Sequence, residues 1–292
     1  MAPARLASPV DTAAYGTYRF NPAGRRYRFA GRIADGGPYA PEAGRYHLYA
    51  GWFCPWSQRV VIARALAGLS GAVTVSYVDN ERDGRGWAFR ERYGPDPVNG
   101  FTLLREAYEA TEPGFDGLVS VPTLWDRVTG RVVSNDYTTI GLDLATRFGA
   151  VAAPLVETYP AALRAEIDAL DGWIGPAVNH GVGAATTAGP EGTRARAALL
   201  DAFARLDERL ATRRYLVGET VTEADIRLWV TLVRYDVGPN AHRAIHAGLH
   251  EFPHLWAYAR DLYTIPAFRE STEFAAFTVA GAEVPDWEGV SA

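Results

Sequence analysis

Apolar residues along the first half of the chain switch between the spacing of strands and that of helices. Residues 46–50 (YHLYA) alternate large apolar side chains with other residues, which predicts a strand. Over residues 55–69, apolar side chains recur every three or four positions, with Arg59 and Arg64 opposite them, which predicts a helix. A second alternating run at 73–78 (VTVSYV) predicts another strand. This order indicates a β-α-β unit.

A long insert separates that unit from a second group of elements. Residues 80–117 have few regular features, and a loop of this length is uncommon unless it is functional. Residues 119–136 predict a β-hairpin that opens around Val121-Pro122, where proline cannot donate to a ladder. Residues 136–148 then predict a helix with Asp136 as its N-cap. The second group therefore reads as a β-β-α unit.

The second half of the chain is helical in period from residue 160 onward. Thr222, followed three residues later by Asp225, resembles a capping box at the start of a helix. Helical spacing also predicts helices over 160–180, 191–212 and 252–263, and the tail after residue 274 has no period. We therefore predict three parts: an ordered N-terminal extension at 1–41, an α/β domain at 42–150, and an all-helical domain with an irregular tail at 151–292.

Composition narrows the functional classes. The chain has 292 residues, of which 48% are hydrophobic and 22% charged, as in an ordinary globular protein of about two domains. Its formal net charge of −5 gives no case for nucleic-acid binding. The N-terminus lacks the apolar core of a signal peptide, and no apolar run is long enough to span a bilayer. One cysteine excludes an internal disulfide, so we expect a soluble, cytoplasmic protein with no membrane partner.

That cysteine, Cys54, falls between the first predicted strand and the first predicted helix. Pro55 suits the first turn of a helix, where its missing N–H leaves no bond unmade. The amide groups and dipole at a helix N-terminus favour thiolate, the reactive form of cysteine. Ser57 stands where a second cysteine would complete a C-x-x-C pair. The alternative interpretation is a buried, inert cysteine, but this position favours a reactive thiol that depends on an external thiol for its release.

The order of these elements, with Cys54 at the first helix and Val121-Pro122 before a strand, resembles the glutathione transferases. Longer stretches resemble the Xi class of that family, the glutathionyl-hydroquinone reductases. They are RYHLYAGWFCPWSQR, LLREAYEATEPGFDGLVSVPTLWD, RYLVGETVTEADIRLWVTLVRYD and FPHLWAYARDLY. The resemblance implies a thioredoxin-like α/β N-terminal domain followed by an all-α C-terminal domain, the glutathione transferase fold.

The resemblance also implies a reaction and a set of site residues. In the family a cysteine attacks the sulfur of a glutathionyl-hydroquinone, forms a mixed disulfide with glutathione, and is freed by a second glutathione. Carried to this chain, Cys54 is the nucleophile and Tyr235, Asn240 and His242 belong to the acceptor-substrate site. The implied thiol-binding residues are Trp87, Val121, Pro122, Asp136 and Tyr137. Trp87 has the alternative role of anchoring its loop, and Asp136 that of a simple N-cap. The family is dimeric, so a homodimer is expected.

The chain departs from the family pattern at the positions that select the thiol. Asn135-Asp136-Tyr137 replaces Asn-Glu-Ser, in which the Glu-Ser pair holds the γ-glutamyl end of glutathione. Thr138 is a candidate for a substitute hydroxyl. The chain has no lysine and is rich in Ala and Gly, a composition typical of a GC-rich genome such as that of an actinobacterium. Together with the change at 136–137, this motivates the hypothesis that the co-substrate is mycothiol, which has no γ-glutamyl group. Glutathione and mycothiol therefore both remain candidate thiols.

The acceptor region departs as well. Pro239 falls near the position of a family tyrosine, and Arg243-Ala244 replaces Phe-Lys. His242, His246 and His250 recur every four residues, and zinc would require a further ligand nearby; an acceptor-lining or solvated face is the favoured interpretation, with no metal. Two other functions stay open: an S-transferase or isomerase without a covalent enzyme intermediate, and a non-catalytic ligand-binding protein.

Overall fold

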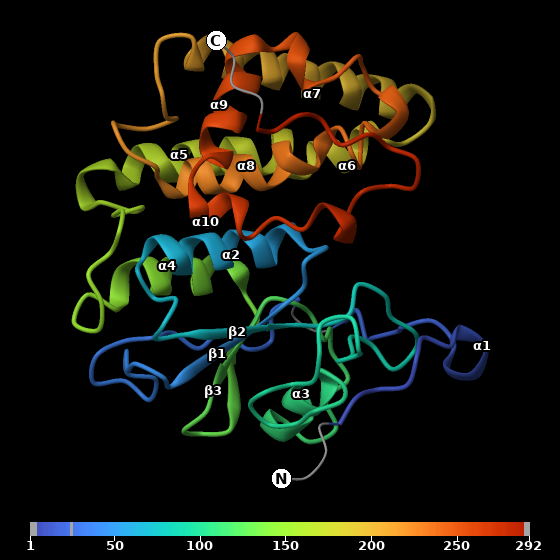
Figure 1. The fold of residues 1–292 in the computed structure, drawn as a ribbon, viewed down its shortest axis with the longest axis vertical. Helices are drawn as coiled ribbons and strands as arrows, with labels where there is room; N and C mark the ends of the chain where they lie inside the picture. Colours follow the sequence, from blue (N-terminus) through green and yellow to red (C-terminus); the bar gives the residue numbers. More distant parts are fainter. Residues whose placement is uncertain (1–4, 24–25, 289–292) are drawn as a thin grey trace. The chain divides into compact units, whose positions relative to one another are not determined.

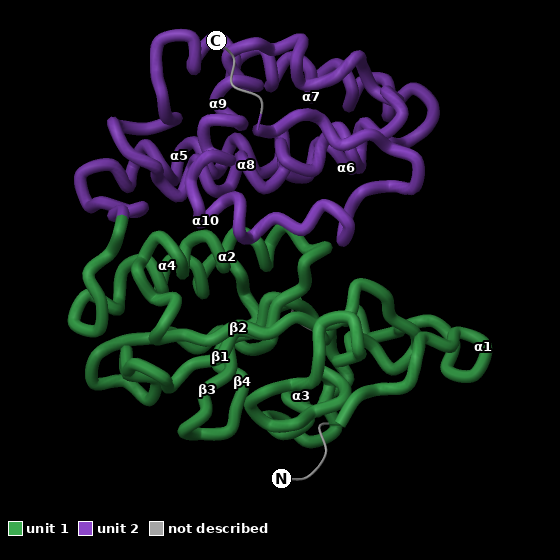
Figure 2. Tube along the Cα trace, in the orientation of Figure 1, with its two compact units in different colours: residues 1–155 green, residues 156–292 purple. Residues whose placement is uncertain are grey.

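The computed structural model describes residues 5–23 and 26–288. Contacts divide the chain into two compact units, residues 1–155 and 156–292 (Figure 2). Of the N-terminal extension predicted at 1–41, residues 1–4 and 24–25 lie outside the described residues. Each unit has its own buried apolar residues.

A four-stranded sheet forms the centre of the first unit, in the order β2-β1-β3-β4 (Figure 1). β1 pairs in parallel with β2 and antiparallel with β3, which in turn pairs antiparallel with β4. The strands are β1 (Tyr46–Ala50), β2 (Thr74–Tyr77), β3 (Thr123–Asp126) and β4 (Arg131–Ser134). The predicted strand-helix-strand unit and the hairpin are both present.

Helices cover both faces of this sheet. α2 (Pro55–Leu66) and α4 (Tyr137–Arg147) lie side by side on one face, and α3 (Arg105–Thr111) contacts β4 from the other (Figure 1). Two clusters of buried apolar residues result: Leu48 belongs to the one beneath α2 and α4, and Tyr49 to the other. Burial of apolar side chains on both faces, at about 25 cal/mol per Å², is the main stabilising contribution.

Because both faces are covered, β1 is buried along its whole length, including His47. The alternation of the sequence correctly predicts the strand, but the polar position is not exposed. His47 is 0% exposed, and its ring nitrogens lie 2.7 Å from Thr74 Oγ1 and 2.8 Å from Ser76 Oγ on β2. Two hydroxyl groups therefore satisfy the imidazole inside the core.

The boundaries of β3 and α2 and the burial of Arg59 test the sequence prediction. β3 begins at Thr123, directly after a cis Val121–Pro122 bond and next to the Val121-Pro122 opening that the pattern predicts. Proline has no amide to donate to a ladder, so regular pairing starts beyond it. α2 ends at Leu66 rather than 69. Arg59, which the pattern places opposite the apolar face of this helix, is buried, because α2 is covered over most of its surface.

The extension is ordered against the first unit. The amide of Ala7 donates to Phe89 O, and the amide of Gly31 donates to Val133 O, each over a long sequence separation. A single helical turn, α1 (Thr12–Tyr15), lies between these contacts (Figure 1). Its aromatic side chains differ in burial: Phe29 packs against the core cluster, whereas Phe20 is 44% exposed.

The second unit is helical, as predicted. The span 160–180, predicted as one helix, is divided by a π-helical turn at Gly175–Asn179, where Pro176 cannot donate to the ladder. The capping box of Thr222 and Asp225 is confirmed at the start of α8. The α-helices are α5 (Arg164–Ile174), α6 (Gly181–Ala185), α7 (Gly189–Leu210), α8 (Glu223–Tyr235), α9 (Pro253–Tyr263) and α10 (Pro266–Arg269).

α8 is the central helix of this unit, since every one of its residues is buried. α5 and α9 pack against it, and α6 and α9 pack on α7. The tail after residue 274 has little regular structure, but Trp287 packs against the rings of Trp229 and Trp256. Within the described part of the chain, no helix has the length and apolar character needed to cross a membrane.

Candidate thiol site

Cys54 is the N-cap of α2, as the sequence pattern predicts. Its backbone is extended (φ −93°, ψ 117°), and its Sγ accepts a hydrogen bond from the amide of Ser57 at 3.4 Å. The thiol also lies 3.5 Å from the carbonyl oxygen of Val121, to which it donates. A sulfur in this position faces the positive end of the helix dipole, which favours the thiolate.

Ser57 occupies the position of a resolving cysteine, and its own groups are engaged. Its hydroxyl accepts a hydrogen bond from the amide of Gly51 at 3.2 Å, while its amide donates to Cys54 Sγ. The side chain is 1% exposed. Ser57 therefore fixes the turn around the cysteine and contributes no second sulfur.

The cis Val121–Pro122 peptide brings the start of the hairpin to the cysteine. Both residues are buried, and the Val121 carbonyl is the group that meets the thiol. Two of the predicted site residues, Cys54 and Val121, are thus in direct contact across a separation of 67 residues.

Trp87, in the long insert at 80–117, packs next to the turn that carries Cys54. Its ring stacks on Phe53, the neighbour of Cys54, with centroids 4.4 Å apart and an interplanar angle of 29°. The guanidinium carbon of Arg82 lies 4.4 Å from the Trp87 centroid and 4.6 Å from the centroid of Tyr18 in the extension. Trp87 therefore anchors its loop and also adjoins the cysteine turn.

Asp136 caps α4, as the sequence predicts. Its Oδ1 accepts from the amide of Thr138 at 3.0 Å and from the Thr138 hydroxyl at 2.6 Å. Among the residues that the structure describes, no hydrogen bond to the second oxygen, Oδ2, is present. The side chain is half-buried, and its Oδ1 holds the start of the helix. Thr138, the candidate substitute hydroxyl, is engaged with Asp136.

Tyr137 belongs to an aromatic wall that we define as Tyr27, Trp56 and Tyr137. Its ring stacks on Trp56 at 4.6 Å and 18°, and meets the edge of Tyr27 at 6.0 Å. Arg59 lies over the same ring, with its guanidinium carbon 5.3 Å from the centroid. The family serine at this position is thus replaced by a ring held in place by its neighbours.

Tyr27 was missed by sequence reasoning, although its extension was expected to be ordered. Burial, together with the nearby Tyr137, Asp136 and Cys54, raises the pKa of Tyr27 to about 12. The hydroxyl therefore stays protonated at neutral pH and is a hydrogen-bond donor near the thiol site. Its position follows from a contact over more than 100 residues, which no local pattern encodes.

The predicted acceptor residues lie in the second unit and differ in exposure. Tyr235 is 0% exposed, its ring meets Phe203 at 5.0 Å, and burial raises its pKa. Asn240 is also 0% exposed; its amide nitrogen donates to Asp236 at 2.7 Å and its oxygen accepts from the amides of Ile245 and His246. His242 is exposed and has a left-handed backbone (φ 58°).

The histidines of this region do not gather around one point. His246 packs its ring on Tyr235 and Phe252, and its Nδ1 accepts from the amide of Gly248 at 2.8 Å. Within residues 5–23 and 26–288, no group of three or more His, Cys, Asp or Glu side chains is arranged to hold a metal ion.

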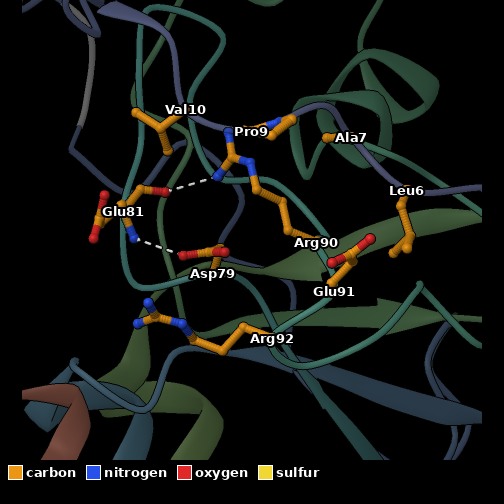
Figure 3. Close-up of a pocket in the computed structure, with 9 residues that line it drawn as sticks. All are labelled: Leu6, Ala7, Pro9, Val10, Asp79, Glu81, Arg90, Glu91 and Arg92. Atoms are coloured by element: carbon orange, nitrogen blue, oxygen red, sulfur yellow. Dashed lines mark hydrogen bonds between the residues drawn. The ribbon is translucent and has the colours of Figure 1, made fainter.

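A pocket of about 440 Å³ lies elsewhere in the first unit, between the extension and the insert (Figure 3). Figure 3 shows Arg90 donating to the carbonyl of Glu81, and the amide of Glu81 donating to Asp79. Its lining residues are Leu6, Ala7, Pro9, Val10, Asp79, Glu81, Arg90, Glu91 and Arg92, none of them a predicted site residue. The pocket marks where the extension is fastened to the insert, apart from the thiol site.

The chain matches two protein-family models and a set of curated relatives. Residues 53–147 match the family model "Glutathione S-transferase, N-terminal domain", and residues 176–261 match "Glutathione S-transferase, C-terminal domain". The chain is 36% identical over 256 residues to glutathionyl-hydroquinone reductase YqjG of Escherichia coli (strain K12). That match covers 82% of this chain and 77% of the relative.

Solved structures agree with the sequence matches. A Xi class transferase from Natrialba magadii is similar with a TM-score of 0.84 and 33% identity, over 90% of this chain and 89% of that one. The glutathione-bound structure of YqjG from Escherichia coli K-12 is similar with a TM-score of 0.82 and 32% identity, over 89% and 94%.

Proposed function

The chain belongs to the Xi class of the glutathione S-transferase family, and on that premise we propose that it cleaves the glutathione conjugate of a quinone-like compound through a mixed disulfide on Cys54. Membership confirms the resemblance, fold class and glutathione transferase-like enzyme predicted from the sequence. The observation that carries the proposal is the position of Cys54 at the start of α2, with the Ser57 amide on its sulfur.

In the first step, the Cys54 thiolate attacks the sulfur of the conjugate. A sulfur–sulfur bond forms as the bond between sulfur and the aromatic carbon breaks. The electron pair of that bond goes to the aromatic carbon, which takes a proton, so the hydroquinone is released in its reduced form. The Ser57 amide and the α2 dipole stabilise the attacking anion. The Val121 carbonyl, which accepts from the free thiol, orients the sulfur before attack.

In the second step, an external thiolate attacks the glutathione sulfur of the mixed disulfide. Oxidised glutathione leaves, and the Cys54 thiolate is regenerated. An external thiol is required because the chain has one cysteine and Ser57 occupies the resolving position. Over the cycle one conjugate and one glutathione become one hydroquinone and one oxidised glutathione, so the two electrons come from the thiols.

We infer that the co-substrate is glutathione, with mycothiol as the alternative. The open Oδ2 of Asp136 supports glutathione, since a carboxylate oxygen at a helix start suits the γ-glutamyl amine. The aromatic wall around Tyr137 supports the alternative, since it places a ring where the family has a serine hydroxyl. Steady-state turnover with each thiol in turn decides between them.

Among the acceptor candidates, we assign direct contact to His242. Tyr235 and Asn240 are fully buried and engaged with the fold of the second unit, so their proposed role is to hold the segment that carries His242. The bend at His242, with its positive φ, turns the imidazole outward from that segment. A reducing cytoplasm and a homodimer complete the proposal, and the dimer is tested by sedimentation of the purified protein.

The test is mass spectrometry of the intact protein after incubation with a glutathionyl-hydroquinone and no free thiol. The proposal predicts one glutathione adduct on Cys54 and release of hydroquinone equal to the protein present. A transferase or isomerase without a covalent intermediate would carry no adduct, and with no free thiol present it would release no hydroquinone. A non-catalytic member of the fold would release no hydroquinone, and Cys54→Ala would leave its ligand binding unchanged.

A further inference from the structure

Arg82 is a cation beside the thiol site that the proposed chemistry does not use. It lies over both Tyr18 and Trp87, and Trp87 stacks on Phe53, the residue before Cys54. The side chain is exposed, and within the described residues no carboxylate pairs with it. Other arginines of the first unit do have carboxylate partners: Arg85 binds Asp83, and Arg28 binds Asp116.

The backbone on either side of Arg82 is fixed. The amide of Glu81 donates to Asp79 at 3.1 Å and its carbonyl accepts from Arg90 at 2.9 Å (Figure 3). On the other side, Asp83 is 0% exposed, binds Arg85 at 2.7 Å, and accepts from the amide of Asp11 in the extension at 3.1 Å. These bonds engage the Asp83 carboxylate and hold the segment that carries the guanidinium.

Tyr18 links the segment that carries Arg82 to the segment that carries Val121. Its ring lies beneath Arg82, and its hydroxyl accepts from the amide of Val119, two residues before Val121. The extension thus fixes the Arg82 side chain relative to both Trp87 and the Val121 carbonyl. A guanidinium with rings over its faces keeps the N–H donors on its edge for a planar anion, and a carboxylate matches that edge with two hydrogen bonds.

We propose that Arg82 is a specificity-determining residue that binds a carboxylate of the thiol co-substrate, held in position by Tyr18 and Trp87. The proposal rests on the proposed function, and it identifies the end of the thiol that carries the carboxylate. If Cys54 receives the sulfur and Asp136 the γ-glutamyl end, the glycine carboxylate of glutathione extends toward Trp87 and Arg82. Mycothiol has no carboxylate, so Arg82 favours glutathione over mycothiol.

The role of Arg82 is tested by measuring thiol binding rather than turnover, so that the result does not depend on the proposed reaction. In a Cys54→Ser background, which forms no adduct, glutathione and its glycine monoethyl ester are titrated calorimetrically into three proteins: Arg82 intact, Arg82→Met and Arg92→Met. We expect glutathione to bind the Arg82 protein at least tenfold more tightly than the ester. Arg82→Met should lose that preference, because methionine still stacks on Trp87 but carries no charge.

Arg92→Met is the matched control, since this arginine lies in the same insert, lines the separate pocket and does not contact Trp87. It should keep the full preference. Arg82→Lys should keep part of the preference, since lysine retains the positive charge but lacks the paired planar N–H donors of a guanidinium. Equal binding of acid and ester to the intact protein, a preference that survives Arg82→Met, or no binding of glutathione would each overturn the assignment. Failure of hydroquinone release alone would overturn only the proposed reaction.

Discussion

The amide of Ser57 donates to the sulfur of Cys54 at 3.4 Å, and the hydroxyl of the same serine accepts from Gly51. One residue therefore supports the proposed nucleophile with its backbone and closes the turn with its side chain. A cysteine at this position would retain the backbone donor and place a second sulfur one helical turn from the first.

We predict that Ser57→Cys changes how the mixed disulfide is resolved. The new thiol can attack the Cys54 sulfur of the mixed disulfide and expel glutathione. The variant should therefore release hydroquinone without accumulating a glutathione adduct on the protein. Mass spectrometry should show an oxidised protein two mass units lighter instead. The control is Ser57→Ala, which keeps the amide donor and adds no sulfur. A glutathione adduct of equal amount in Ser57→Cys and the parent would contradict this account of the turn.

A second prediction concerns the stack of Tyr137 on Trp56. Tyr137→Ser should lower the KM for glutathione about tenfold, because a small hydroxyl next to Asp136 can donate to a carboxylate where the ring now lies. Loss of the stack should also lower the stability of the first unit by about 1 kcal/mol. Initial rates against glutathione concentration measure the first effect, and thermal unfolding the second.

Tyr137→Phe is the control for that change, since it removes the phenol hydroxyl and keeps the stacked ring. It should leave both KM and stability near those of the parent. If Tyr137→Ser leaves the KM for glutathione unchanged, the aromatic wall does not limit recognition of the γ-glutamyl end.

Local signals in the sequence were enough for the two helix caps of the thiol site. Cys54 and Asp136 each cap the helix that begins at the next residue, and a cap depends on bonds to groups only two or three positions away. The strand around His47 was also predictable from its alternation. Its burial was not, because that depends on what covers the second face of the sheet.

Contacts between distant segments could not be read from any local pattern. Tyr18 reaches Val119 across 101 residues, and Arg82 lies over Tyr18 only because the extension is bound to the insert. Arg59 looked like an outer-face residue of its helix, but the tertiary structure buries it. The sequence therefore located Cys54 at the start of its helix, while the residues that surround the thiol depended on the fold.

His47 leads to a third prediction, on the pH dependence of stability. Burial, and secondarily the charges of Arg127 and Arg64, lower the pKa of His47 to about 3 from its ordinary 6.5. The unfolded chain therefore takes up a proton that the folded chain excludes as the pH falls below 6.5. This group alone should remove about 2 kcal/mol of stability between pH 7 and pH 5. Stability is retained above pH 6.5 and lost progressively toward pH 3.

Urea unfolding of the parent and of His47→Gln at pH 7 and pH 5 measures that contribution. The variant should be less stable at pH 7, because it disturbs the bonds to Thr74 and Ser76, yet its stability should fall less between the two values. His254→Gln serves as the control, since His254 is exposed on α9 and should not alter the slope. Equal losses in the parent and His47→Gln would refute the assignment.

The capping box of α8 gives the last prediction. Asp225 is fully buried and accepts from the amides of Leu216 and Thr222 and from the hydroxyl of Tyr258. Asp225→Ala would leave these donors buried without an acceptor, so we expect the second unit to lose about 3 to 5 kcal/mol of stability. Thermal unfolding measures this loss, with Asp201→Ala, an exposed change on α7, as the control. A Tm unchanged from that control would show that the α8 cap is dispensable. A large loss would show that the second unit depends strongly on this one carboxylate. Asp225 joins the segments of Leu216 and Thr222 to α9, because Tyr258 belongs to that helix.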